Sequence, residues 1–158
     1  MVNFLNFSKL ISTTSKQIEN VIINPYIYFI FAYMNKPLTE QELHNLAMNH
    51  VGKDLEQRGF EFIAINSKLK KHPQFVCMDK TKQYYFVIVR AVILPENPNN
   101  YDVVWMESFK KHARENDAKV LYAGVGLGSI KNEKTPIYLN EEYLLEYNGI
   151  QVLETNLN

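Results

Sequence analysis

The sequence predicts a single α/β domain in which a mixed β-sheet is flanked by two principal helices. Three observations indicate this fold class. Residues 40–58 repeat apolar side chains at helical spacing, residues 84–94 are a dense run of Tyr, Phe, Val and Ile, and a second helical segment separates that run from another apolar stretch at 119–125. A strand, a helix and a further strand of these lengths imply parallel pairing through a right-handed crossover. A chain of 158 residues has room for one such domain.

The first predicted helix, over residues 40–58, has clear signals at both ends. Thr39 is an N-cap residue, and Glu42 three positions later completes a capping box. Gly59 lies just beyond the last turn, where a glycine commonly ends a helix. We therefore expect an amphipathic helix that packs on the sheet.

Three strands are expected after this helix. The apolar period changes at residue 60, so residues 60–65 are predicted as a strand, and residues 75–78 as a second short one. Residues 84–94 have the apolar density of a strand that is covered on both faces, which places it in the middle of the sheet.

The remaining elements begin at Asp102, which can cap a helix that runs to about residue 116. A strand over 119–125 follows. The C-terminal part predicts an appendage made of a strand at 136–139, a short helix over 141–147 and a last strand at 150–153.

Residues 1–33 differ in composition from the rest of the chain, and we place the domain at residues 34–158. Their apolar part, about residues 21–33, is shorter than the roughly 20 residues of a membrane span and contains Pro25. No membrane partner is therefore expected. We interpret residues 1–33 as a poorly ordered extension or the product of a start codon upstream of Met34; an N-terminal helix or strand packed on the domain is the alternative.

Charge and cysteine content exclude several classes of protein. Seventeen basic and seventeen acidic residues give a formal net charge of zero, so no overall field favours nucleic acid or acidic membranes. The single cysteine, Cys77, excludes an internal disulfide, a four-cysteine zinc site and a cysteine-held iron–sulfur cluster within one chain. We expect Cys77 to be a buried apolar residue, the protein to be cytoplasmic, and no metal or cofactor to be bound.

Three segments, residues 55–63, 73–76 and 86–90, together resemble the restriction-endonuclease-like PD-(D/E)XK nuclease superfamily. The resemblance covers about residues 40–127. It implies a restriction-endonuclease-like mixed sheet with a core of helix, strand, strand, strand, helix and strand. The strand-helix-strand appendage would follow this core.

The catalytic positions that the resemblance implies do not carry catalytic residues. The metal-binding Asp of the family falls on Gln74, its Glu on Ile88 and its Lys on Arg90, and a first-helix acid would fall near Met48. Nucleases of this type need carboxylates to hold Mg²⁺ and to activate water. Arg90 stays protonated and cannot act as a general base, although it can bind an anion or pair with a carboxylate. The chain is thus predicted to be a pseudoenzyme, with no catalytic residue assigned.

A second resemblance covers about residues 34–153 and is carried by residues 38–43, 122–127 and 136–143. These segments resemble a small bacterial family often labelled as the F component of sodium-translocating NADH:quinone reductase. That label implies a ferredoxin domain, a flavin- and NADH-binding module and a transmembrane anchor. The chain is too short for these parts and has one cysteine where the cluster needs four.

Glycines at 124, 126 and 128 allow two interpretations. A glycine-rich loop after a strand can bring backbone N–H groups to a pyrophosphate, but a helix should then follow, and Pro136 and its polar neighbours predict a loop instead. We favour a strand that ends in a glycine turn.

A basic patch is predicted around the second strand. Tyr84, Tyr85 and Trp105 could add stacking surfaces for a nucleic acid if they are exposed. A solvated loop and a homo-oligomer formed between this patch and the acidic C-terminal part are the alternatives. The patch consists of Lys68, Lys70, Lys71, His72, Lys80 and Lys82.

Our functional hypothesis is a catalytically degenerate, nuclease-like module that binds a protein or a nucleic acid. The alternatives are a hydrolase in which acids such as Glu56, Glu61 or Asp79 have taken over the role of the lost ligands beside Arg90, and the reductase label, which the residues do not support.

Overall fold

The computed structural model describes residues 25–34 and 36–153. The chain divides into two compact units, residues 1–35 and residues 36–158. In the first unit the described part is the helix α2 (Pro25–Met34), whose side chains from Tyr26 to Phe31 are exposed. No helix in the described ranges is long and apolar enough to cross a membrane. The interpretation of residues 1–33 as an extension or start-site product falls mostly on residues 1–24, outside the described part.

Helix α3 (Glu40–Gln57) begins and ends as its sequence predicts. The Thr39 backbone N–H donates to Glu42 Oε2 at 2.7 Å, and Glu42 N donates to Thr39 Oγ1 at 3.3 Å, which forms the capping box. Gly59 has a φ of +82°, a conformation that glycine adopts without strain. The buried face of α3 carries His44, Ala47, Met48, Val51 and Leu55.

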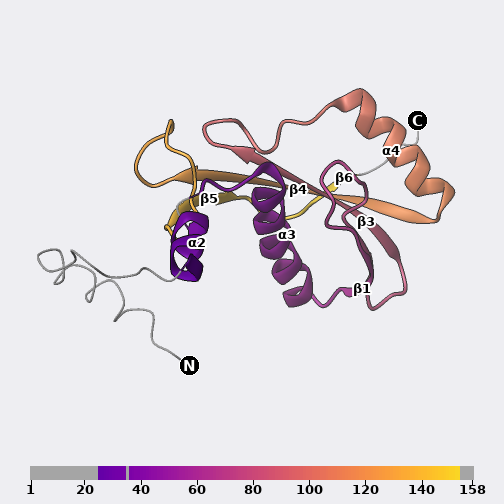
Figure 1. Cartoon of the computed structure of the whole chain (residues 1–158). Helices are drawn as coiled ribbons and strands as arrows, with labels where there is room; N and C mark the ends of the chain where they lie inside the picture. Colours follow the sequence, from indigo (N-terminus) through magenta and orange to yellow (C-terminus); the bar gives the residue numbers. More distant parts are fainter. Residues whose placement is uncertain (1–24, 35, 154–158) are drawn as a thin grey trace, which may run out of the picture. The chain divides into compact units, whose positions relative to one another are not determined.

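The second unit contains one six-stranded sheet (Figure 1). The strands β1 (Glu61–Ile65), β2 (Phe75–Met78) and β3 (Tyr84–Ile93) pair as an antiparallel meander. Helix α4 (Val103–Glu115) then carries the chain to β4 (Ala118–Ser129), which pairs with β3 in parallel. The predicted order of helix, three strands, helix and strand is confirmed, as is the parallel crossover.

Strand β3 lies in the middle of the sheet and is covered on both faces. Successive side chains of a strand point to opposite faces. Val87 and Val89 accordingly pack in the cluster that includes α3, whereas Ile88 packs with Met106 and Phe109 of α4. The unbroken apolar run of this segment therefore reflects burial from two sides.

The C-terminal part differs from the prediction. The segment expected to be a helix is the strand β5 (Tyr143–Tyr147), which pairs with the end of β4, and β6 (Gln151–Leu153) pairs with an earlier part of β4. Both belong to the main sheet, so the strand-helix-strand appendage is wrong. The predicted strand at 136–139 contributes one isolated bridge, between Pro37 and Tyr138. The free edge of β4 decides this region, because unpaired strand N–H and C=O groups accept a partner strand regardless of weak local helix signals.

The glycine segment is also different from both of its predicted forms. Strand β4 continues through Gly124, Gly126 and Gly128, with no turn before Ser129. A Cβ atom on Gly124 would lie 2.2 Å from the carbonyl oxygen of Pro98. The glycines therefore let the loop between β3 and α4 lie directly on β4, and they do not form a phosphate-binding loop.

Cys77 is confirmed as a buried apolar residue in β2. Burial raises the pKa of its thiol to about 12. The reactive thiolate is therefore scarce at neutral pH, and the side chain acts in packing.

A carboxylate on α3 ties this helix to β5. Asp54 accepts hydrogen bonds from Arg58 Nε at 2.7 Å and from the Tyr147 hydroxyl at 2.6 Å. Burial alone would raise the pKa of Asp54, but the hydrogen bonds from Arg58 and Tyr147 outweigh it and the pKa is lowered. The ionised form of Asp54 therefore stabilises the contact between α3 and the C-terminal hairpin.

We predict that Asp54→Asn lowers the free energy of unfolding by roughly 1–2 kcal/mol at neutral pH. Because the folded-state pKa lies below the unfolded value of about 3.9, the contribution is present above that value and is lost as the pH falls through the folded-state pKa. Urea unfolding at neutral pH and at successively lower pH values should show the difference shrinking below about pH 4. Glu56→Gln, an exposed change on the same helix, is the control; an Asp54→Asn deficit that does not depend on pH would contradict the assignment.

Candidate functional site

A cavity of about 530 Å³ opens where the first turns of α3, the loop before β2, the end of β3 and the start of α4 meet. We call it the α3–α4 cavity. Its volume lies within the range of small-molecule sites in proteins. It forms at the carboxyl end of β3, the strand that pairs in parallel with β4, a place where α/β proteins commonly bind ligands.

The three positions that the nuclease resemblance singled out, Gln74, Ile88 and Arg90, all line this cavity. Ile88 and Arg90 are two residues apart on β3 and therefore share a face of the sheet. Gln74 immediately precedes β2, which pairs with β3. Positions that are 14 and 16 residues apart in sequence thus meet at one site.

Gln74 is fully buried and has a structural role in the sheet. Its backbone N–H donates to Val87 O at 2.9 Å, and its side-chain Oε1 accepts from Val89 N at 2.9 Å. The side-chain Nε2 donates to Lys71 O at 2.7 Å and lies 2.9 Å from His72 Nδ1. The side-chain amide of Gln74 therefore bonds to β3 just before the start of β2. Its oxygen already accepts the backbone N–H of Val89.

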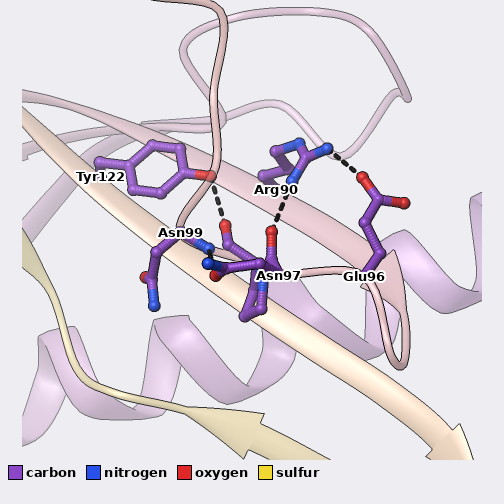
Figure 2. Close-up of polar contacts among 6 residues, drawn as sticks. Arg90, Glu96, Asn97, Asn99 and Tyr122 are labelled. Atoms are coloured by element: carbon purple, nitrogen blue, oxygen red, sulfur yellow. Dashed lines mark hydrogen bonds and ion pairs between the residues drawn. The ribbon is translucent and has the colours of Figure 1, made fainter.

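The other two positions offer no ligand for a metal ion. Ile88 is 3% exposed and packs against α4. Arg90 forms an ion pair with Glu96 and donates from Nη1 to Asn97 O at 3.3 Å (Figure 2). The guanidinium thus holds the loop that follows β3, and its positive charge is balanced by the carboxylate of Glu96.

A buried tyrosine anchors the same loop from β4. The hydroxyl of Tyr122 donates to Pro98 O at 2.6 Å (Figure 2). Burial raises the pKa of Tyr122, so its hydroxyl keeps its proton at neutral pH. Together, Arg90 and Tyr122 fix the loop after β3, from which Glu96 lines the cavity.

The acids that the hydrolase alternative would need beside Arg90 lie away from it. Glu61 of β1 pairs with Met78 of β2, and Met78 pairs with Tyr84 of β3. Tyr84 is six residues before Arg90, so Glu61 is displaced from Arg90 by about 20 Å along the strand direction. Asp79 follows Met78, and its carboxylate accepts from Thr81, Gln83 and Tyr85. Neither these two acids nor Glu56 lines the cavity. Within residues 25–34 and 36–153, no group of three His, Cys, Asp or Glu side chains could hold a metal ion.

His44 was not predicted as a site residue, yet it lines the cavity. It is 3% exposed, and its Nε2 is the only buried side-chain nitrogen or oxygen in the described part of the chain without a hydrogen-bond partner. Burial, and then the proximity of His72, lower its pKa, so the imidazole is neutral at pH 7. His44 and Met48 are four residues apart and so share a helix face, but nothing in the sequence showed that a cavity lies there.

The predicted basic patch separates into two groups. Lys68, Lys70, Lys71 and His72 belong to the loop between β1 and β2, whereas Lys80 and Lys82 belong to the turn between β2 and β3, at the opposite end of β2. We call Lys68, Lys70 and Lys71 the loop lysines. Lys70 and His72 line the α3–α4 cavity. The role of the patch in binding nucleic acid stays a prediction.

Trp105 is the one aromatic candidate that lies at the cavity. It is 38% exposed, stacks on Phe109 with ring centroids 5.3 Å apart, and meets the ring of His72 at 4.8 Å. Tyr84 and Tyr85 lie at the far end of β3, and the hydroxyl of Tyr85 donates to Asp79 at 3.0 Å.

The family described as "Domain of unknown function (DUF8840)" matches residues 41–153. The chain belongs to the DUF8840 family. The matched region includes every residue that lines the cavity except Glu40, and it excludes α2. No curated protein matches the chain. Membership in the DUF8840 family supports neither the reductase label nor the nuclease classification.

Proposed function

We propose that this DUF8840 domain is a non-catalytic module that binds single-stranded nucleic acid, built on a degenerate nuclease-like fold. One observation carries the proposal: positions 74, 88 and 90 meet at one cavity, and none of them supplies a carboxylate. The element order α3, β1, β2, β3, α4, β4 agrees with the order that the resemblance implies.

The surroundings of the cavity favour a nucleic acid over a protein partner. The three loop lysines are close in sequence and lack a carboxylate neighbour among the described ion pairs, so they can neutralise phosphates beside the cavity, which Lys70 lines. The partly exposed ring of Trp105 stands at the same cavity and offers a stacking surface. Unpaired bases stack on such aromatic rings without sequence preference, which favours a single strand.

Hydrolysis is the less favoured alternative. Metal-dependent cleavage needs carboxylate oxygens beside the attacking water. Glu96 is paired with Arg90, and Asp102 accepts from Trp105 N at 3.0 Å as the N-cap of α4. We also propose a reducing, cytoplasmic environment, which is supported by the single buried cysteine.

We predict that a labelled single-stranded oligonucleotide binds and that Lys70→Glu with Lys71→Glu abolishes the binding. Neutralising about three phosphates of a single strand gives a slope near −2 in log affinity against log salt, or roughly 20-fold weaker binding between 50 and 200 mM salt. Fluorescence anisotropy at the two salt concentrations measures both effects. Magnesium should produce no cleavage products in the same samples.

Lys80→Glu with Lys82→Glu is the matched control. It makes the same change of charge at the other end of β2. Each pair also includes one residue with positive φ, Lys70 or Lys82, so the two double variants are matched in backbone conformation as well. Equal losses in the two double variants would show that general charge drives the binding. Absence of binding by the wild-type protein would reject the proposal in favour of a protein partner, and magnesium-dependent cleavage would revive the hydrolase.

A further inference from the structure

The interior of the α3–α4 cavity is close to balanced in charge. Glu40, Glu96 and Asp102 line it together with Lys70 and Arg90, and Glu96 is paired with Arg90. The rest of the lining is largely apolar and includes Leu43, Leu69, Ile88, Val92 and Met106. A phosphate gains little electrostatic attraction in such a space. A flat neutral ring, in contrast, can place its faces against the apolar side chains and its polar edge against the polar ones.

The buried polar side chains of the lining are already hydrogen-bonded, with one exception. The buried side chains of Gln74 and Tyr122 donate to backbone carbonyl groups at 2.7 and 2.6 Å. His44 Nε2 has no partner, and it is the only buried side-chain nitrogen or oxygen of which this holds in the part of the chain that the structure describes. A buried polar atom without a partner is uncommon in a folded protein and points to a missing ligand or water.

We propose that the cavity receives one unpaired nucleobase, whose polar edge bonds to His44 Nε2 and whose ring lies beside Trp105. The inference rests on the proposed function and identifies the part of the strand that enters the site. The phosphates stay outside, on the loop lysines, one of which, Lys70, lines the cavity.

The state of His44 favours a ligand of this kind. A neutral imidazole has one nitrogen that donates and one that accepts, depending on the tautomer. The edge of a nucleobase carries donors and acceptors side by side, so it can satisfy either form of Nε2. The base faces are apolar and can pack on Leu43 and Leu69, which are partly exposed and line the cavity from α3 and the loop before β2.

Two single-stranded oligonucleotides of equal length separate the contribution of the base from that of the phosphates. One has a mixed sequence with all four bases, and the other has abasic sites throughout. The wild-type protein should bind the strand with bases at least about tenfold more tightly than the abasic strand, because the abasic strand lacks both the hydrogen bond to His44 and the contact with Trp105. Trp105 is the only tryptophan of the chain, so its fluorescence should change with the first strand and not with the second.

His44→Leu should reduce the affinity for the strand with bases by about tenfold and leave the affinity for the abasic strand unchanged. His50→Leu is the matched control. His50 lies on the same helix, packs on Tyr147 with ring centroids 4.8 Å apart, and does not line the cavity. It should bind both strands as the wild-type protein does.

The outcomes distinguish this inference from the proposed function. Equal affinity of the wild-type protein for the two strands would overturn the base site and leave nucleic-acid binding intact, whereas binding of neither strand would overturn both. A His44→Leu variant that keeps the full wild-type preference for the strand with bases would overturn the role of His44. If that variant does not fold, the ¹⁵N shift of the His44 ring in the wild-type protein decides, because only a bound base should move it.

Discussion

Gly124→Ala is expected to lower the free energy of unfolding by about 3 kcal/mol or more, the largest effect that we predict for a single added methyl group. A Cβ at this position would lie 2.2 Å from Pro98 O and 2.6 Å from Pro98 C. Both are backbone atoms of the loop that Arg90 and Tyr122 hold in place, so no side-chain rotation relieves the clash. The loop has to lift from β4, and the hydrogen bond of Tyr122 breaks with it.

Chemical denaturation of the variant measures this loss. Gly52→Ala is the matched control, because its Cβ would meet only the ring of Phe75 at 3.6 Å, an ordinary contact, and because alanine is favoured over glycine within a helix. That variant should be as stable as the wild-type protein or up to about 1 kcal/mol more stable. Wild-type stability of Gly124→Ala would show that the loop does not pack on β4 as described.

Gln74→Leu is expected to lower the free energy of unfolding by about 3 kcal/mol, although the two side chains are similar in size. The substitution leaves the backbone N–H of Val89 and the carbonyl of Lys71 without their partners. Each unsatisfied buried group costs about 1–3 kcal/mol. The effect would show that the side chain at this position stabilises the sheet.

Two measurements check the role of Gln74. Denaturation gives the loss of stability, and hydrogen exchange should show faster exchange of the Val89 amide. Gln83→Leu is the control, because the side-chain amide of Gln83 donates to two exposed carbonyl groups, those of Tyr84 and Asp117. Its loss should stay below about 1 kcal/mol, and an equal loss in both variants would contradict the structural role of Gln74.

The elements that local sequence signals specify were predicted well. The capping box at Thr39 and the apolar period after it located α3, Asp102 located the start of α4, and residues 75–78 were predicted as β2 with its observed bounds. Such signals depend on hydrogen bonds and side-chain spacing within a few residues, so they can be read without knowing the fold.

The errors occurred where a distant segment decides the local structure. Residues 143–147 carry a weak helix signal, yet they form a strand because the twelve-residue β4 offers an open edge. The glycines from 124 to 128 indicated a turn, yet they are strand residues that make room for Pro98 and Leu94. Neither partner lies near in sequence, so no local pattern could reveal it.

The candidate site shows the same division. The resemblance singled out positions 74, 88 and 90, and the sequence alone showed that the first two carry no carboxylate and the third a permanent charge, because a side chain's chemistry belongs to the residue itself. Only the tertiary structure brought these positions to one cavity, separated Lys80 and Lys82 from the loop lysines, and left His44 buried there without a partner. Those facts depend on how strands pair and helices pack, and such contacts join residues that are far apart along the chain.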